Sequence, residues 1–212
     1  MLLKKVIIFK FFFILVLSKI TLKSYSQSFK GGINIGFVAS QVDGDGLGGY
    51  NKPGFNVGLI CDYLMNEKSY LTMGINYIQK GSRKISNPEI PGDRHYILRL
   101  NYIEVPFLYG LKFPIKIKYL IFLEGGLTFG YLIKAMEDVD RSGFIEPQPP
   151  FKKYDLPARF GINYVIKDKL FLKFYFSYSL LPIRPHPGNK VWYYDRGQYN
   201  NYLLLTLFYY FI

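Results

Sequence analysis

The chain has 212 residues, of which 50% are hydrophobic, and its 20 tyrosines, 19 phenylalanines and 20 glycines are more typical of a membrane β-barrel than of an average globular domain. The single cysteine, Cys61, excludes an internal disulfide and a thiolate metal cluster. The net charge of +12 comes from basic residues scattered along the chain, which argues against a nucleic-acid partner.

The first 26 residues have the three parts of a secretory signal peptide. A basic start that includes Lys4 precedes an apolar core over residues 6–17, and the small residues Ser24 and Ser26 occupy positions −3 and −1 of a cleavage site. An uncleaved membrane anchor is the alternative, although the apolar core is shorter than the roughly 20 residues that a membrane helix needs. The sequence therefore predicts a signal peptide that is removed after export.

Residues 27–212 form the predicted mature domain, in which apolar residues repeat with a period of two. This period indicates β-strands with one apolar and one mixed face. The predicted strands span residues 28–39, 55–65, 71–80, 101–113, 119–133, 158–166, 170–179 and 202–212. The pattern is clearest from Ile103 to Phe113, a length that suits a membrane strand. The last strand is apolar on both faces, so its register is not defined.

Short turns and long loops alternate between the predicted strands. Short turns are expected at residues 66–68, 114–118 and 167–169, and long loops at 42–52, 83–94, 134–153 and 181–198. This alternation predicts an all-β, eight-stranded, antiparallel up-and-down transmembrane barrel with its short turns in the periplasm. The alternative is a soluble eight-stranded barrel of the lipocalin kind, whose outward polar face would carry charges in place of the Asn, Gly and Ser found here.

Four short phrases in the predicted strands carry a family resemblance. They are GFNVGL at residues 54–59, YIQKG at 77–81, NYIEVP at 101–106 and EGG at 124–126. Together they resemble the outer-membrane β-barrel domain of Bacteroidetes often called PorT-like, over about residues 28–212. The resemblance implies an eight-stranded barrel in the outer membrane, and because the family's namesake takes part in type IX secretion and gliding, it suggests a secretion role. The chain departs from the usual aromatic C-terminal residue, since Phe211 is followed by Ile212.

Several charged residues fall on the predicted inward faces. The candidate site residues are Glu104, Glu124, Arg159 and Lys173. The interior of an eight-stranded barrel is just filled by side chains, so we expect these four to pair as a structural charge network rather than to form an ion path. Asp62 and Lys112 are expected at the periplasmic rim in contact with solvent.

Other candidate chemistry is weaker. A Ser-His-acid arrangement could combine Ser179, His95 and Glu89, as in enzymes that modify lipid A, but no motif fixes its geometry. The DGDG sequence at residues 43–46 resembles the start of a calcium loop, but Gly54 stands where a bidentate glutamate is required. The proline-rich residues 146–150 suit either polyproline recognition or rigid spacing. We expect no catalytic, metal or cofactor site.

These observations predict a monomeric, non-enzymatic barrel in the bacterial outer membrane. Its expected partners are outer-membrane lipid, lipopolysaccharide and another envelope or secretion protein. The loops at residues 42–52 and 134–153 would present the surface for that protein. The alternatives are a lipid A modifying enzyme and a barrel that binds or conducts a small solute.

Overall fold

A computed structural model describes residues 29–84, 86, 89, 94–113, 121–185 and 197–211. The predicted signal peptide, the turn at 114–118 and much of the second and fourth loops lie outside these residues. In the described part, no helix has the length and apolar character needed to cross a membrane.

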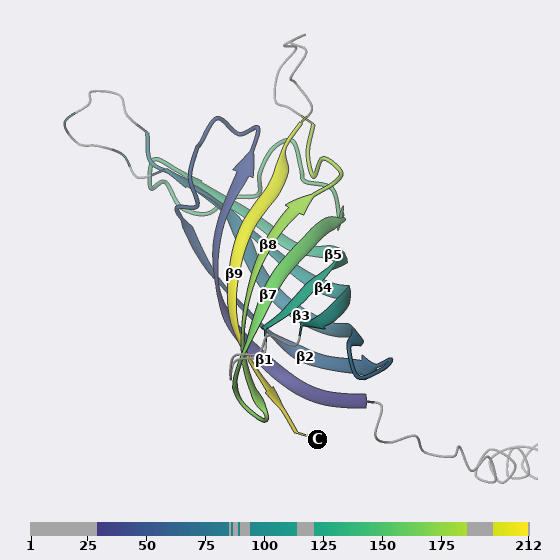
Figure 1. The fold of residues 1–212 in the computed structure, drawn as a ribbon. Coiled ribbons are helices and arrows are strands. Elements are labelled where there is room, and N and C mark those ends of the chain that lie inside the picture. The colour runs from purple at the N-terminus through teal and green to yellow at the C-terminus, as the bar shows by residue number, and fades with distance from the viewer. Residues whose placement is uncertain are drawn as a thin grey trace, which may run out of the picture.

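Antiparallel strands account for most of the described chain. They are β1 (Phe29–Asp43), β2 (Lys52–Leu64), β3 (Ser69–Lys84), β4 (Tyr96–Phe113), β5 (Ile121–Val139), β6 (Tyr154–Asp155), β7 (Pro157–Lys167), β8 (Leu170–Ser179) and β9 (Tyr199–Tyr210). Apart from β6 and β7, which do not pair with each other but both pair with β5, each strand pairs with its sequence neighbours, and β1 also pairs with β9, so that the sheet closes into a barrel (Figure 1). The predicted all-β, eight-stranded barrel is confirmed.

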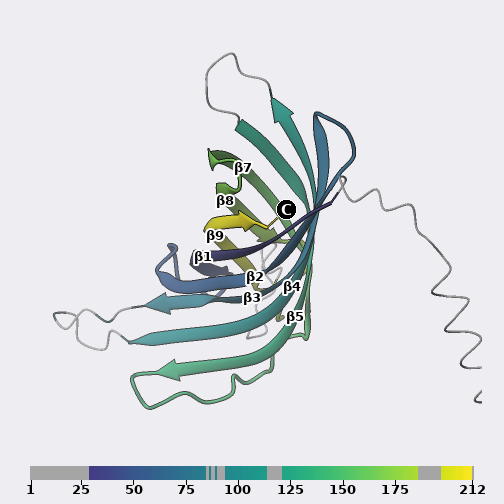
Figure 2. The same ribbon diagram turned by 90° about the horizontal axis from the view of Figure 1, so that it is seen from below.

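The short strand β6 does not add a ninth wall strand. Both β6 and β7 pair with β5 in one continuous register, so together they form one wall strand that is interrupted at Leu156. Several strands also extend farther outward than predicted: β4 begins at Tyr96 and β5 continues to Val139. The predicted ends were wrong here because the backbone ladder continues past the level at which the apolar alternation is clear. Figure 2 shows the long strands β3, β4 and β5 side by side in the wall.

The exterior of the barrel is apolar and the interior is largely polar. On β2, for example, Leu59 is 63% exposed, whereas the next residue, Ile60, is 5% exposed. A broad apolar exterior of this kind is the lipid-facing surface of an outer-membrane barrel. In β9, pairing with β1 and β8 directs Leu205 and Leu207 outward and Thr206 inward, which settles the register that the sequence left open.

Aromatic side chains gather at both ends of this apolar surface. Toward the periplasmic end, the rings of Phe29 and Tyr63 lie 4.9 Å apart between centroids. Toward the outer end, Phe55 and Tyr77 lie 5.3 Å apart. Aromatic girdles at the two membrane interfaces are typical of outer-membrane barrels, because these rings suit the boundary between lipid and water.

Candidate functional site

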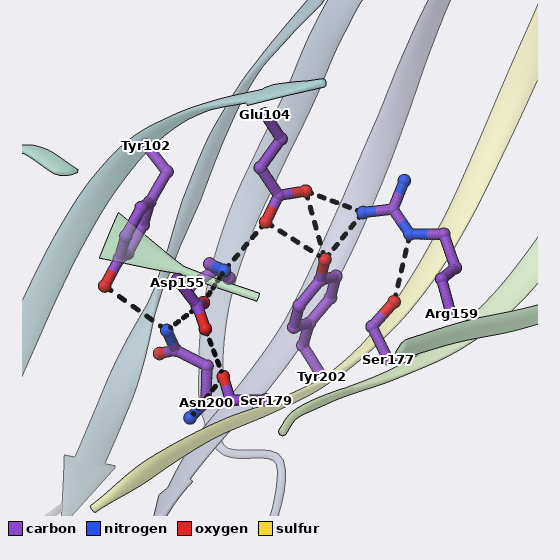
Figure 3. A network of polar contacts seen from close by, with 9 residues as sticks. Tyr102, Glu104, Asp155, Arg159, Ser177, Ser179, Asn200 and Tyr202 are labelled. Atoms are coloured by element: carbon purple, nitrogen blue, oxygen red, sulfur yellow. Dashed lines mark hydrogen bonds and ion pairs between the residues drawn. The ribbon is translucent and has the colours of Figure 1, made fainter. Parts of the chain in front are cut away.

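Ionisable side chains meet in the middle of the barrel interior, where Glu104 of β4 is 0% exposed. Glu104 Oε2 accepts a hydrogen bond from Arg159 Nη2 of β7 at 2.6 Å, and Glu104 Oε1 accepts one from Lys80 Nζ of β3 at 2.8 Å. The Tyr202 hydroxyl donates to the same carboxylate at 3.1 Å (Figure 3). Arg159 also donates from Nε to Ser177 Oγ at 3.0 Å. Strands from opposite sides of the barrel are therefore joined through one carboxylate.

A second carboxylate, Asp155 of β6, extends this network outward. Asp155 Oδ2 lies 3.0 Å from Lys80 Nζ and accepts a hydrogen bond from Asn200 Nδ2 at 2.8 Å. Asp155 Oδ1 accepts one from Ser179 Oγ at 2.7 Å, as Figure 3 shows. Neither Lys80 nor Asp155 was predicted to be a member of the network. Asp155 continues the inward alternation of Arg159 at every second residue, and this signal could have identified it.

The remaining predicted site residues form a separate cluster nearer the periplasm. Glu124 Oε1 of β5 accepts hydrogen bonds from Lys173 Nζ of β8 at 2.8 Å and from the Tyr70 hydroxyl at 2.6 Å. The Tyr175 hydroxyl donates to Glu124 Oε2. Asn163 Nδ2 donates to the Tyr70 hydroxyl at 2.9 Å. The structure thus places Glu104 with Arg159 and Glu124 with Lys173, in two clusters at different levels of the interior.

The expectation that Asp62 is solvated was wrong. Asp62 is only 6% exposed, and its carboxylate accepts hydrogen bonds from Thr72 Oγ1 at 2.7 Å and from the Tyr210 hydroxyl at 2.6 Å. The Tyr210 ring, whose hydroxyl makes this contact, packs against the Phe171 ring at 5.1 Å between centroids. Lys112 is partly exposed beside a cleft of about 70 Å³. That volume holds only a few water molecules.

Comparison with protein families assigns the chain to a family of outer-membrane proteins. The model of the outer membrane protein beta-barrel domain family matches residues 23–184. The chain belongs to this family. It is a small β-barrel of the bacterial outer membrane, as the lipid-facing exterior described above also requires.

Two solved structures are among those similar to this outer-membrane barrel. One is Ail, the attachment invasion locus protein of Yersinia pestis, at 17% identity and a TM-score of 0.45, with 86% of this chain and 98% of that chain covered. The other is Neisserial surface protein A (NspA), at 16% identity and a TM-score of 0.45, with 87% and 97% covered. Neither likeness bears on function. No curated protein sequence matches this chain.

The residues considered for catalysis do not assemble in this outer-membrane barrel. Ser179 Oγ donates to Asp155, whereas the backbone N–H of His95 donates to Asp140 Oδ1 at 3.2 Å. In the described ranges, no hydrogen bond joins Ser179 to His95. Glu89 is exposed in the second loop. Among the described residues, Ser179 therefore has a carboxylate acceptor and no histidine base.

The DGDG segment begins at the last residue of β1 and forms a turn that is held by local hydrogen bonds. Asp43 Oδ1 accepts a hydrogen bond from Gln41 Nε2, and Asp45 Oδ1 accepts one from the Leu47 N–H, both at 2.7 Å. Burial raises the pKa of the Asp45 carboxyl. Among the residues that the structure describes, no group of three or more His, Cys, Asp or Glu side chains has an arrangement suited to a metal ion.

The outer loop that follows β5 is held against the fourth loop of the barrel. The backbone N–H of Lys152 donates to the Ile183 carbonyl at 2.7 Å. The Arg184 guanidinium lies 4.1 Å from the Phe151 ring centroid and donates to the Pro149 carbonyl at 3.3 Å. The proline-rich segment therefore has a fixed position on the outer surface.

Proposed function

We propose that this outer-membrane barrel is a non-enzymatic structural or accessory component of an envelope complex, as in the secretion machinery suggested by its resemblance to PorT-like proteins of Bacteroidetes. The observation that supports this proposal is the filled interior. The paired side chains Lys80, Glu104 and Lys173 are at most 1% exposed, so they are not available to a solute or substrate.

The surfaces left for interaction are the lipid-facing exterior and the outer loops. Outer-membrane lipid and lipopolysaccharide contact the exterior of a monomeric barrel. The outer loops next to β4 and β5 extend beyond the lipid, because these strands are long. They have 18 and 19 residues, whereas β8 has 10. The contacts between Phe151, Lys152 and the fourth loop hold one of these loops in a defined shape, which favours recognition by a protein partner.

The test is extraction of the tagged protein from its native outer membrane in mild detergent, followed by identification of the proteins that copurify. We expect stoichiometric copurification of envelope or secretion proteins. Replacement of residues 142–148 by a flexible Gly-Ser segment of equal length should abolish it, whereas the same treatment of the turn at 66–68 should not. Recovery of the wild-type barrel alone, as a monomer, would contradict an accessory role.

The other functions considered from the sequence have weaker support. A lipid A modifying enzyme needs an accessible nucleophile with a base, whereas the Ser179 hydroxyl is 0% exposed and hydrogen-bonded to Asp155. A solute-binding or conducting barrel needs a water-filled interior, whereas two charge clusters occupy this one. Activity on lipid A that is lost in His95→Ala would favour the enzyme.

A further inference from the structure

The exterior of the barrel changes from apolar to polar at one level on β3 and β4. Outward from the periplasm, the lipid-facing residues of β4 are apolar from Phe113 to Ile103. With the usual rise and tilt of membrane strands, that stretch spans about 25 Å, the height of the apolar band of an outer-membrane barrel. The next exterior pair is Gln79 and Asn101, which lie opposite each other and share a hydrogen bond of 3.2 Å. This pair marks the outer boundary of the hydrocarbon layer.

Three cations lie just beyond this boundary, Arg83 and Arg99 at outward-facing positions of β3 and β4 and Lys52 at an inward-facing position of β2. We refer to these three residues as the rim cluster. Arg99 lies opposite Gly81 in the β3–β4 ladder, two residues from Arg83. Both arginines add positive charge around Lys52. Lys52 is 4% exposed, and its ammonium group donates to the Pro53 carbonyl at 2.6 Å. Three like charges therefore share one short stretch of the outer rim.

Among the residues that the structure describes, the rim cluster differs from the buried cations of the interior in having no anionic partner. Lys80, Arg159 and Lys173 each lie within 3.0 Å of a carboxylate oxygen. Across the described part of the chain, no carboxylate forms an ion pair with any member of the rim cluster. The Nε atoms of Arg83 and Arg99 are also buried without a hydrogen-bond acceptor among the described residues.

Buried guanidinium donors without acceptors are costly, and their mutual repulsion adds to that cost. An oxyanion would remove both penalties, because phosphate accepts several charge-assisted hydrogen bonds from arginine at once. Space for a phosphate and part of its carrier lies beside Arg83. A cleft of about 410 Å³ there is lined by Gly46, Leu47, Gly48, Asn51, Arg83 and Lys84.

We propose that the rim cluster binds a phosphate group of lipopolysaccharide in the outer leaflet. A soluble phosphorylated molecule offers the same chemistry, but the position of the cluster directly above the apolar exterior favours the lipid, whose phosphates lie at that level. This inference depends on the outer-membrane location and not on the accessory role. A barrel without protein partners could still bind lipopolysaccharide, and a barrel that does not bind lipopolysaccharide could still have protein partners.

The experiment measures the binding of lipid A to the full mature barrel in detergent micelles by native mass spectrometry. Three probes are compared: bisphosphorylated lipid A, dephosphorylated lipid A and inorganic phosphate. We expect the wild type to prefer the bisphosphorylated lipid. The double variant Arg83→Gln/Arg99→Gln should bind it about thirtyfold more weakly, since each charge near such a surface contributes about fivefold. Should the double variant misfold, each single variant should show the fivefold loss.

Arg94→Gln/Arg141→Gln is the matched control, because it removes the same charge from exposed positions at the same end of the barrel. This control should bind like the wild type, and Arg83→Lys/Arg99→Lys should retain most of the binding. Heat-dependent gel mobility verifies that each variant is folded. Equal affinity in the wild type and in the double Gln variant would overturn the site. Binding of inorganic phosphate to the rim cluster without any preference for phosphorylated lipid A would overturn the lipid source.

Discussion

Glu104 is the residue on which the interior network depends most, because Lys80, Arg159 and Tyr202 all donate to its fully buried carboxylate. Glu104→Gln keeps the shape of the side chain and removes its charge, which leaves Arg159 with no anionic partner among the described residues. We expect the free energy of unfolding to fall by about 3 to 5 kcal/mol, the usual cost of breaking a buried ion pair from one side. Urea titration of the barrel in lipid vesicles, followed by gel mobility, measures this loss.

Two comparisons isolate the role of charge in that result. Glu67→Gln, in the exposed turn after β2, should change stability by less than about 0.5 kcal/mol. The double variant Glu104→Gln/Arg159→Met should lose less stability than the sum of its single variants, because the two residues share one contact of 2.6 Å. Strict additivity would mean that the pair is not coupled.

Glycines on one strand make room for tyrosines of the next strand, and this arrangement places the donors to Glu124. Gly110 of β4 lies opposite Tyr70 of β3, and a Cβ at Gly110 would come within 2.2 Å of the Tyr70 ring. Gly110→Ala should therefore displace the ring and weaken the hydrogen bond from Tyr70 to Glu124. We expect a loss of about 1 to 3 kcal/mol in the same unfolding assay, the range for an overpacked core.

Gly31→Ala is the control for this strand-level effect, because Gly31 has open space around the position of an added Cβ. It should leave stability unchanged or raise it slightly, since alanine restricts the unfolded chain more than glycine does. Equal losses in Gly31→Ala and Gly110→Ala would show that the cost comes from strand propensity and not from the contact with Tyr70.

The strands were predictable where lipid imposes a strict alternation, as from Ile103 to Phe113. The register of β9 was not, because Leu203, Leu204 and Leu205 suit either face and only the ladders with β1 and β8 decide it. The charge partners were not predictable either. Glu104 lies opposite Asn76 and Gly130 in its own ladders, whereas it contacts Arg159 across the lumen. That contact depends on strand tilt and stagger, which the local sequence does not determine.

At the scale of the whole molecule, the two charge clusters block the lumen at different levels. Arg159 lies over the Tyr175 ring at 5.5 Å, and Tyr175 donates to Glu124, so the two levels are in contact. An eight-stranded barrel is just wide enough for such a filling. The molecule therefore consists of a plugged cylinder with a lipid-facing belt, and the outer loops extend from one end of it.

A plugged cylinder should not conduct ions. In planar bilayers, we expect the wild-type barrel to give no stable current steps, and the same should hold for Arg94→Gln, whose side chain is exposed outside the lumen. A variant with Lys80, Glu104, Asp155 and Arg159 of the central cluster and Glu124 and Lys173 of the second cluster all changed to Ala removes both sets of ion pairs without leaving one charge of a pair behind, and should admit water and produce measurable current. Stable conductance in the wild type would instead support a solute channel, because ions would then have a path past Glu104 and Glu124.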